Sequence, residues 1–309
     1  MIQLGVIGMS AGNAHPYSWS AIVNGYFDAE EITAVGYPAV AAYLKANRDT
    51  LGLPAARVTH VWCQDRKIAE SISKAVQVPN IVNKLEDMIG KVDAVLLGRD
   101  DPENHVAMAK PFIEAGIPLF IDKPLAGSWD DLAYFKEQVA KGKFIMSGSS
   151  QRYANEFKTV KQEIHNLGKI ELVTAVGKKD WLKYGVHLME GIFSLLDDPK
   201  AATVQHIGRD GQDIVHIELE NGLHISMHMF MDITGTFQAS VYGQNGWRLI
   251  EVRNSYSQFR DNIIEFIRSV QEGKPRLAFE KTENIIRTLI AAKDSLQQGG
   301  KKIQVYARS

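Results

Sequence analysis

The stretch Ile2-Gln-Leu-Gly5-Val-Ile-Gly8-Met-Ser-Ala-Gly12 decides the fold of the first half of the chain. A short apolar run passes directly into a glycine-rich turn, which is typical of a buried strand that leads into a helix. Glycines there allow the backbone to approach a pyrophosphate, whose charge meets N–H groups at the helix N-terminus. The spacing departs from G-x-G-x-x-G, since Gly12 comes four residues after Gly8. A tight turn without a ligand needs similar residues, so both interpretations stay open.

Short apolar runs of this kind recur through the first 150 residues, with amphipathic helical patterns between them. They lie at Ile2–Ile7, Val58–Trp62, Val92–Leu97, Leu119–Ile121 and Phe144–Met146. Continuous apolar runs suit parallel strands that are covered on both faces. The alternation therefore predicts right-handed βαβ units in a doubly wound parallel sheet.

The pattern changes after about residue 150. Apolar and polar residues alternate strictly over Val215–Leu219 and over Ile225–Met229, and Asn221-Gly222 between them predicts a hairpin. Two amphipathic helices, Phe259–Val270 and Ile285–Leu296, close the chain. We expect an α/β protein with a Rossmann-type dinucleotide-binding domain over residues 1–125. An α+β domain with a mostly antiparallel open sheet should follow over residues 126–309.

Composition narrows the function classes. Hydrophobic residues make up 45% of the 309 residues, enough for the cores of two ordinary domains. Lys and Arg number 35 against 36 for Asp and Glu, so the chain as a whole carries no field that attracts nucleic acid or an anionic membrane. Cys63 is the single cysteine, which excludes an intramolecular disulfide. With neither a signal-peptide pattern nor an apolar stretch of roughly 20 residues, we expect a cytoplasmic protein.

Charged residues follow the second and fourth expected strands. Cys63 stands where a carboxylate binds the ribose diol of NAD, and Asp65 comes two residues later; Arg66 would instead meet the 2′-phosphate of NADP, so the cofactor is NAD or NADP. Lys123, in Asp122-Lys123-Pro124, follows Leu119–Ile121 at the edge where open α/β sheets bind ligands. A partly desolvated lysine there can move a proton. An ordinary exposed lysine before a turn proline is the other interpretation.

A second acid–base candidate lies in Lys183-Tyr-Gly-Val-His187-Leu-Met-Glu190. On a helix, Lys183, His187 and Glu190 share one face. A lone histidine is usually structural, whereas one flanked by a lysine and a carboxylate is a better candidate for proton transfer.

Together these stretches resemble the glucose–fructose oxidoreductase/inositol dehydrogenase family (Gfo/Idh/MocA) over nearly the whole chain. The most specific likeness runs from Asp93 through Asn104-His105 and Glu114–Pro118 to Asp122-Lys123-Pro124, where the family has Glu-Lys-Pro. Gly185-Val-His187 is similar to the family's helix with a catalytic histidine. The resemblance implies NAD(P)-dependent oxidation of a sugar or polyol alcohol, or reduction of the matching ketone.

The resemblance also assigns roles to single residues. Lys123 helps to move the hydroxyl proton, and His187 hydrogen-bonds the reacting oxygen and acts as acid or base. With Lys183, these are the expected catalytic residues. The expected cofactor contacts are Gly8, Ser10, Gly12, Asn13, Asp65, Arg66, His105, Asp122 and Lys123. The expected substrate contacts are Lys123, Arg152, Lys183 and His187; for Arg152, simple surface solvation is an equal alternative.

Three departures from the family pattern matter. Lys183 stands where the family usually has an aspartate, which suits a carboxylated or phosphorylated substrate, or else marks changed or lost catalysis. Glu190 replaces the aspartate that the family often has three residues after the histidine, a mild change. Residues 27–53 look like an insertion, with a helix near Ala39–Asn47, that borders either the cleft or an oligomer contact.

The alternative to an enzyme is a non-catalytic dinucleotide- or sugar-binding regulatory protein. Retention of both Lys123 and His187 argues against it. A further hypothesis is an enzyme that keeps NAD bound and recycles it, so that the net reaction is an elimination or a hydrolysis.

The polar face of the alternating strands carries His216, His224, Ser226 and His228. His224 and His228 lie about 13 Å apart on a strand, too far to share one ion, and we expect no metal. This face is either substrate-facing or a subunit interface. The resemblance favours the interface, and so we expect a homodimer or homotetramer through the C-terminal sheet, with no nucleic-acid or membrane partner.

Overall fold

The computed structural model describes residues 1–306 and divides them into two compact units. The first comprises Met1–Ala126, Ala133–Ser147 and Phe259–Phe279. The second comprises Gly127–Leu132, Gly148–Gln258 and the remainder of the described chain from Glu280 onward.

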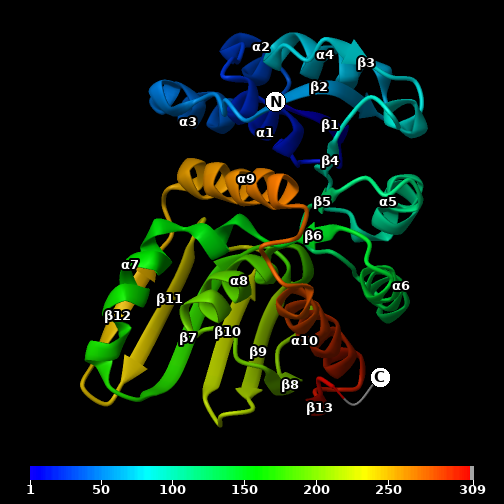
Figure 1. The fold of residues 1–309 in the computed structure, drawn as a ribbon. Coiled ribbons are helices and arrows are strands. Elements are labelled where there is room, and N and C mark those ends of the chain that lie inside the picture. Colours follow the sequence, from blue (N-terminus) through cyan, green and yellow to red (C-terminus); the bar gives the residue numbers. More distant parts are fainter. Residues whose placement is uncertain (307–309) are drawn as a thin grey trace. The chain divides into compact units, whose positions relative to one another are not determined.

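The first unit is built on a six-stranded sheet in the order β3-β2-β1-β4-β5-β6, in which every pair is parallel (Figure 1). The strands are β1 Ile2–Gly8, β2 Ala56–Cys63, β3 Asn80–Ile81, β4 Ala94–Leu97, β5 Leu119–Ile121 and β6 Ile145–Ser147. The strand order reverses between β1 and β4, and ligands of such sheets bind beyond the carboxyl ends of the strands at this switch point. The expected doubly wound sheet is confirmed.

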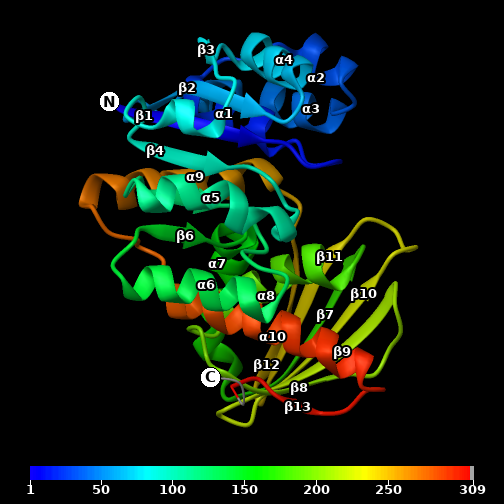
Figure 2. The ribbon, with the colours of Figure 1, turned by 90° about the vertical axis from the view of Figure 1, so that its right-hand side faces the viewer.

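Helices cover both faces of this sheet (Figure 2). They are α1 His15–Asn24, α4 Arg66–Val76, α5 His105–Glu114, α6 Trp129–Ala140 and α9 Ser255–Glu272. Most of α9 belongs to this unit although it comes from the far end of the sequence. Its Phe266 ring lies 5.6 Å from the Phe120 ring of β5 and 6.4 Å from the Phe144 ring, measured between centroids.

The segment expected as an insertion holds two helices, α2 Ala29–Ala34 and α3 Pro38–Ala46. Only the second was expected. The carboxylate of Asp28 caps α2 by accepting from the backbone N–H groups of Glu30 and Glu31. The segment packs on α1, where Tyr43 donates to the Ser18 hydroxyl.

The second unit is a seven-stranded sheet in the order β12-β11-β7-β10-β9-β8-β13. The strands are β7 Ile170–Lys178, β8 Ala201–His206, β9 Gln212–Leu219, β10 His224–Phe230, β11 Phe237–Gly243, β12 Gly246–Glu251 and β13 Ile303–Gln304. All pairs are antiparallel except β7 with β10. β9 and β10 form the expected hairpin, with Gly222 at φ 80° in its turn. The expected open, mostly antiparallel sheet is confirmed.

One face of this sheet is covered by α7 Asn155–Glu163, α8 Val186–Leu195 and α10 Phe279–Gln297 (Figure 1). Val215, Ile217, Ile225 and Met227 are buried on that side. The other face carries the partly exposed histidines of β9 and β10 and the exposed rings of Tyr242 and Trp247.

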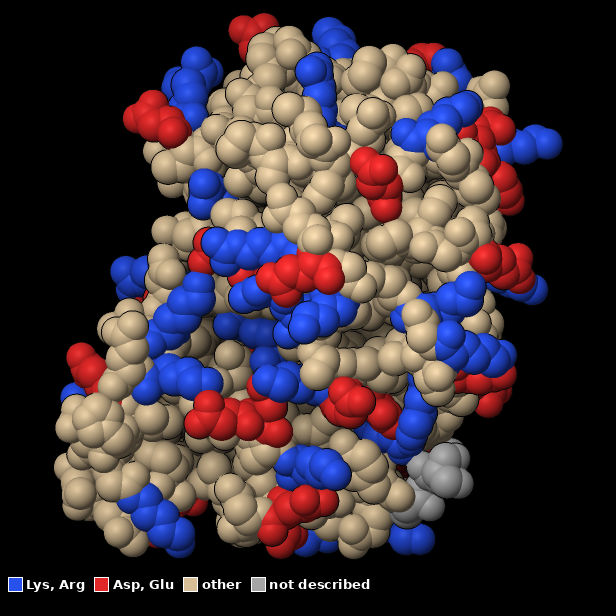
Figure 3. All heavy atoms as spheres, viewed as in Figure 1, with Lys and Arg blue, Asp and Glu red and all other residues tan. Residues whose placement is uncertain are grey.

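Basic and acidic side chains are intermixed over the visible surface (Figure 3), in keeping with the near-zero net charge of the chain. Within residues 1–306, no helix has the length and apolarity needed to cross a membrane.

Candidate functional site

The turn after β1 is shaped as a dinucleotide cradle requires. A Cβ on Gly8 would lie 2.7 Å from Cγ of Pro16 and 3.3 Å from Sγ of Cys63, so the close approach of the turn to α1 and β2 needs a glycine. Gly12 has φ 77° with open space around it. Within the described chain, the backbone N–H groups of Ser10, Ala11, Gly12 and Ala14 donate no hydrogen bond, and no acidic residue stands in the first turn of α1. These features fit a pyrophosphate.

Asp122 ties this turn to the lysine loop after β5. Its carboxylate accepts from Asn13 Nδ2 at 2.8 Å and from the Lys123 backbone N–H at 2.8 Å, and it pairs with His15 Nδ1 at 2.5 Å. Burial alone would raise the pKa of Asp122. The charge and hydrogen bond of His15, together with Lys123 and Asn13, instead lower it to about 2. The carboxylate is therefore ionised at working pH.

Lys123 is buried at the same edge of the sheet, with only 4% of its surface exposed. Its Nζ lies 3.6 Å from Oδ2 of Asp100, which follows β4. Oδ1 of Asp100 accepts from the Ser10 hydroxyl at 2.6 Å, and Ser10 Oγ accepts from the Asp100 backbone N–H. The contacts of Asp100 with Ser10 and with Lys123 thus join the glycine turn to the ends of β4 and β5 at the switch point. The interpretation of Lys123 as an ordinary exposed lysine is wrong.

The charged residues after β2 are engaged locally. Oδ1 of Asp65 caps α4 by accepting from the Lys67 backbone N–H, and Arg66 bonds to Glu70 and Asn83. Gln64 lies across the glycine turn instead, because its amide bonds both the N–H and the C=O of Met9 and also accepts from Arg99.

His105 does not point to the cofactor edge as a contact residue would. It is fully buried, and its ring nitrogens lie 3.0 Å from the backbone oxygen of Leu125 and 2.8 Å from that of Arg99. Both nitrogens are engaged by the backbone, so His105 fixes the loop that carries Asp100 and the loop that follows Lys123.

In the second unit, His187 is held by a serine. Nδ1 of His187 lies 2.6 Å from Oγ of Ser149, and that oxygen also accepts from the Gln151 backbone N–H at 3.2 Å. Ser149 directly precedes the 3₁₀ turn Ser150–Tyr153, and His187 is the second residue of α8. The rings of Tyr184 and Phe237 flank the imidazole, with centroids at 5.7 and 5.6 Å.

Arg152 and Glu190 form a buried ion pair next to Ser149, the residue that holds this histidine. Glu190 accepts from Arg152 Nε and from the Ser149 backbone N–H. The other edge of the guanidinium bonds Asp198 at 2.7 and 3.1 Å. Because its donors are used in this way, the geometry argues against a direct contact of Arg152 with substrate; it stabilises the Ser149 turn instead.

The expected single helix through Lys183 is interrupted. Trp181–Gly185 forms a π-helical turn, and the α-helix begins only at Val186. A π turn adds a residue to the helix repeat, so Lys183, His187 and Glu190 do not form one α-helical stripe. Lys183 is half-buried, and its backbone N–H donates to Asp180, which caps the turn.

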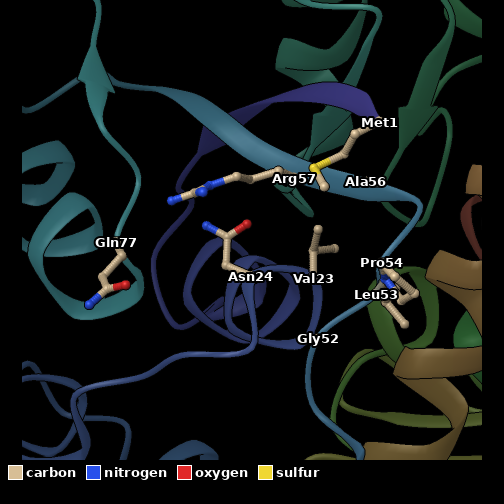
Figure 4. Close-up of a pocket in the computed structure, with 9 residues that line it drawn as sticks. All are labelled: Met1, Val23, Asn24, Gly52, Leu53, Pro54, Ala56, Arg57 and Gln77. Atoms are coloured by element: carbon tan, nitrogen blue, oxygen red, sulfur yellow. The ribbon is translucent and has the colours of Figure 1, made fainter.

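An open cavity of the first sheet lies away from the glycine turn and Lys123. This cavity of about 500 Å³ lies at the opposite edge of the first sheet, lined by Met1, Asn24, Ala56, Arg57 and Gln77 among others (Figure 4). Met1, Ala56 and Arg57 lie at the amino ends of β1 and β2, where open α/β sheets do not bind dinucleotides. Among residues 1–306, no three metal-ligating side chains converge.

Comparison with known proteins adds to this geometry. Residues 2–150 match the profile of a protein family described as an oxidoreductase family with an NAD-binding Rossmann fold, GFO_IDH_MocA. Over these residues, just under half of the chain, the sequence is thus similar to the Gfo/Idh/MocA family. The expected class, an oxidoreductase with a nicotinamide dinucleotide cofactor, is thereby confirmed. A search of curated protein sequences gives no match.

Solved structures share the whole fold of this chain. A scyllo-inositol dehydrogenase from Lactobacillus casei with bound NAD(H) and scyllo-inositol has 13% identity and a TM-score of 0.77, covering 99% of this chain and 100% of its own. A myo-inositol dehydrogenase from the same organism, with NAD(H) and myo-inositol, has 15% identity and a TM-score of 0.78, covering 100% and 98%. A probable dehydrogenase from Thermotoga maritima has 14% identity and a TM-score of 0.77, and the match covers 98% of this chain and 99% of its own. Identities this low establish a common fold.

Three site residues escaped the sequence analysis: Asp100, Gln64 and Ser149. Asp100 stands in Arg99-Asp100-Asp101 directly after β4, at the same edge as Gly8, and this position was the available signal. No local pattern marks Ser149, because its partner His187 is 38 residues away.

Proposed function

We propose that this chain is a Gfo/Idh/MocA oxidoreductase that oxidises a sugar or polyol alcohol, or reduces the matching ketone, with Lys123 and His187 handling the proton. The observation that carries the proposal is the Ser10–Asp100–Lys123 chain, which places a buried lysine against the dinucleotide turn. The inositol dehydrogenases of the same fold support a polyol-like substrate. NAD, when bound, supplies hydride transfer at its nicotinamide ring.

Lys123 is the group that moves the proton at the reacting oxygen. Asp100 is buried beside it, with Oδ2 at 3.6 Å from Nζ, and fixes the direction of the head group, whose hydrogens can then meet an oxygen on which negative charge develops. Asp122 fixes the backbone of Lys123 and so limits the positions that Nζ can reach.

His187 orients the same oxygen in this proposal. Nδ1 of His187 is engaged by Ser149 Oγ, which also accepts the Gln151 N–H, so the ring is held in one orientation. We assign the other ring nitrogen, Nε2, to the reacting oxygen, where it shares the handling of the proton with Lys123.

NAD is the cofactor that the strand-end residues favour. The Asp65 carboxylate stands at the start of α4, beside the turn, and a 2′-phosphate would meet its charge. Arg66, the expected partner of that phosphate, is bonded to Glu70 and Asn83 instead.

The proposal is tested first by titration with NADH and with NADPH, following energy transfer from tryptophan to the reduced nicotinamide. Saturable binding with a lower dissociation constant for NADH is expected. A screen of sugars and polyols with NAD then follows. Folded, cofactor-free protein that binds neither dinucleotide would contradict the proposal.

Substitution of Lys123 separates an enzyme from a regulatory binding protein. Lys123→Met keeps the apolar stem but removes the ammonium. We expect turnover to fall by a factor of about 10²–10⁴, the usual contribution of acid–base catalysis, with NADH affinity within a few-fold of wild type. Exposed Lys110→Met serves as the control. Equal turnover of Lys123→Met and wild type would remove Lys123 from the mechanism.

We further propose that the chain self-associates through the open face of the second sheet. Trp247 is 58% exposed and Leu249 is 52% exposed there. Large apolar side chains that lie together on a surface typically mark an interface.

A further inference from the structure

A lysine beside His187 takes no part in the proton chemistry described above. Lys179 directly follows β7 and has φ 77°, in the left-handed region that residues with side chains rarely adopt. Its backbone N–H donates to the Phe230 oxygen at 2.9 Å, which holds the chain in this conformation. Backbone strain of this kind is unfavourable for folding and is concentrated at functional sites.

The head group of Lys179 is placed against the aromatic neighbour of His187. Its Nζ lies 4.2 Å from the centroid of the Tyr184 ring and donates to the Tyr184 hydroxyl at 2.5 Å. Tyr184 in turn contacts His187 and stacks on Phe237 at 6.4 Å. The ammonium is thus two contacts away from the imidazole, at the end of a wall of aromatic rings.

The sequence around this wall is rich in positive charge. Lys178, Lys179 and Lys183 lie within six consecutive residues, among which Asp180 is the single acid. The Asp180 carboxylate is used to cap the π turn, where it accepts from the Lys183 N–H. A second acid, Asp232, follows β10 two residues after Phe230, whose backbone oxygen accepts the Lys179 N–H. Neighbouring like charges raise the energy of the free protein and are offset when an anion binds.

We propose that Lys179 and Tyr184 form a subsite for an anionic group of the substrate, which makes the substrate class acidic sugars. This inference rests on the proposed function, in which His187 binds the reacting oxygen of the same molecule. The ammonium and the tyrosine hydroxyl together offer donors to a carboxylate or phosphate oxygen. The aromatic wall between them and His187 suits the apolar face of a sugar ring.

The test is isothermal titration calorimetry on the full chain, without cofactor and again with saturating NADH. Three matched sets of probes are used: glucose, galactose and mannose, their uronic acids, and their 6-phosphates. At least one acidic sugar should bind about tenfold more tightly than its neutral parent, as a charged hydrogen bond provides. The uronate and phosphate sets distinguish the two sources of negative charge. The advantage should shrink as NaCl is raised.

Lys179→Met should abolish the preference for the acidic sugar, and Tyr184→Phe should reduce it by a smaller factor. Lys169→Met, which makes the same change of charge at an exposed lysine elsewhere in this unit, is the matched control and should keep the preference. The proposal is overturned if wild type binds acidic and neutral sugars equally or binds none, or if the control loses the preference as well. Failure of NADH to bind contradicts the proposed function instead, since the titration without cofactor reports the subsite alone.

Discussion

The carboxylate of Asp122 joins the glycine turn, α1 and the lysine loop of the first unit. Its pKa of about 2 lies below the ordinary value of 3.8, so between these values the folded protein holds an ionised carboxylate where the unfolded chain is already protonated. The stabilisation is complete above about pH 4 and is lost as the pH falls towards 2.

Asp122→Asn should therefore lower the free energy of unfolding at pH 7 by about 2 kcal/mol. It should also flatten the loss of stability between about pH 4 and pH 2. Urea unfolding at a series of pH values measures both effects. Exposed Asp49→Asn is the control, and an Asp122 variant with the same acid profile as wild type would show that the carboxylate is not the titrating group.

At the same scale, Ser149 fixes the imidazole of His187 through one hydroxyl. Ser149→Ala should lower kcat about tenfold with a smaller change in KM, because the ring loses its orientation while substrate contacts remain. The pH profile of kcat should shift as well, and Ser149→Thr should restore it. The neighbouring buried Ser150, which donates to Gln258, gives Ser150→Ala as a control. A change in KM alone would assign Ser149 a merely structural role.

At the scale of elements, periodicity predicted the strands well. β5 has the expected bounds, Leu119–Ile121, and β9 and β10 contain the alternating runs on which they were predicted. Local patterns cannot reveal that β7 pairs in parallel with β10, since their residues are about fifty positions apart. The π turn before α8 was also beyond prediction, because the Lys183–Glu190 spacing is equally compatible with a regular helix.

The β9–β10 turn offers a direct test of backbone conformation. Gly222 has φ 80°, and a Cβ at this position would meet no atom within 4 Å, so Ala there clashes with nothing but adopts an unfavourable backbone region. Gly222→Ala should destabilise the protein by about 1 kcal/mol. Gly235→Ala, equally open but without a positive φ, should change the melting temperature little. Equal effects of the two would contradict this explanation.

At the scale of the molecule, the open face of the second sheet governs association. Trp247→Lys combined with Leu249→Lys should yield the monomer mass in light scattering, whereas wild type should give a dimer or tetramer. Tyr26→Lys, at an exposed ring of the first unit, is the control for added charge. A monomeric wild type would rule out the interface.

The candidate site was predictable where the chain itself marks it. Gly8, Asp122 and Lys123 stand at strand ends that the apolar runs locate, and His187 lies in a recognisable motif. Their partners were not predictable, since Asp100 meets Ser10 across ninety residues and Ser149 meets His187 across 38. Such pairs are set by which strands become neighbours, a property of topology and not of local sequence.

The position of α9 in the first unit has a consequence for biosynthesis. Phe266 covers Phe120 and Phe144, but it leaves the ribosome about 120 residues after β6. At about 5–20 residues per second, the nascent sheet waits roughly 6–24 s with part of its apolar surface uncovered. The growing chain is thus a natural client for chaperones that shield apolar surface until translation has supplied the missing helix.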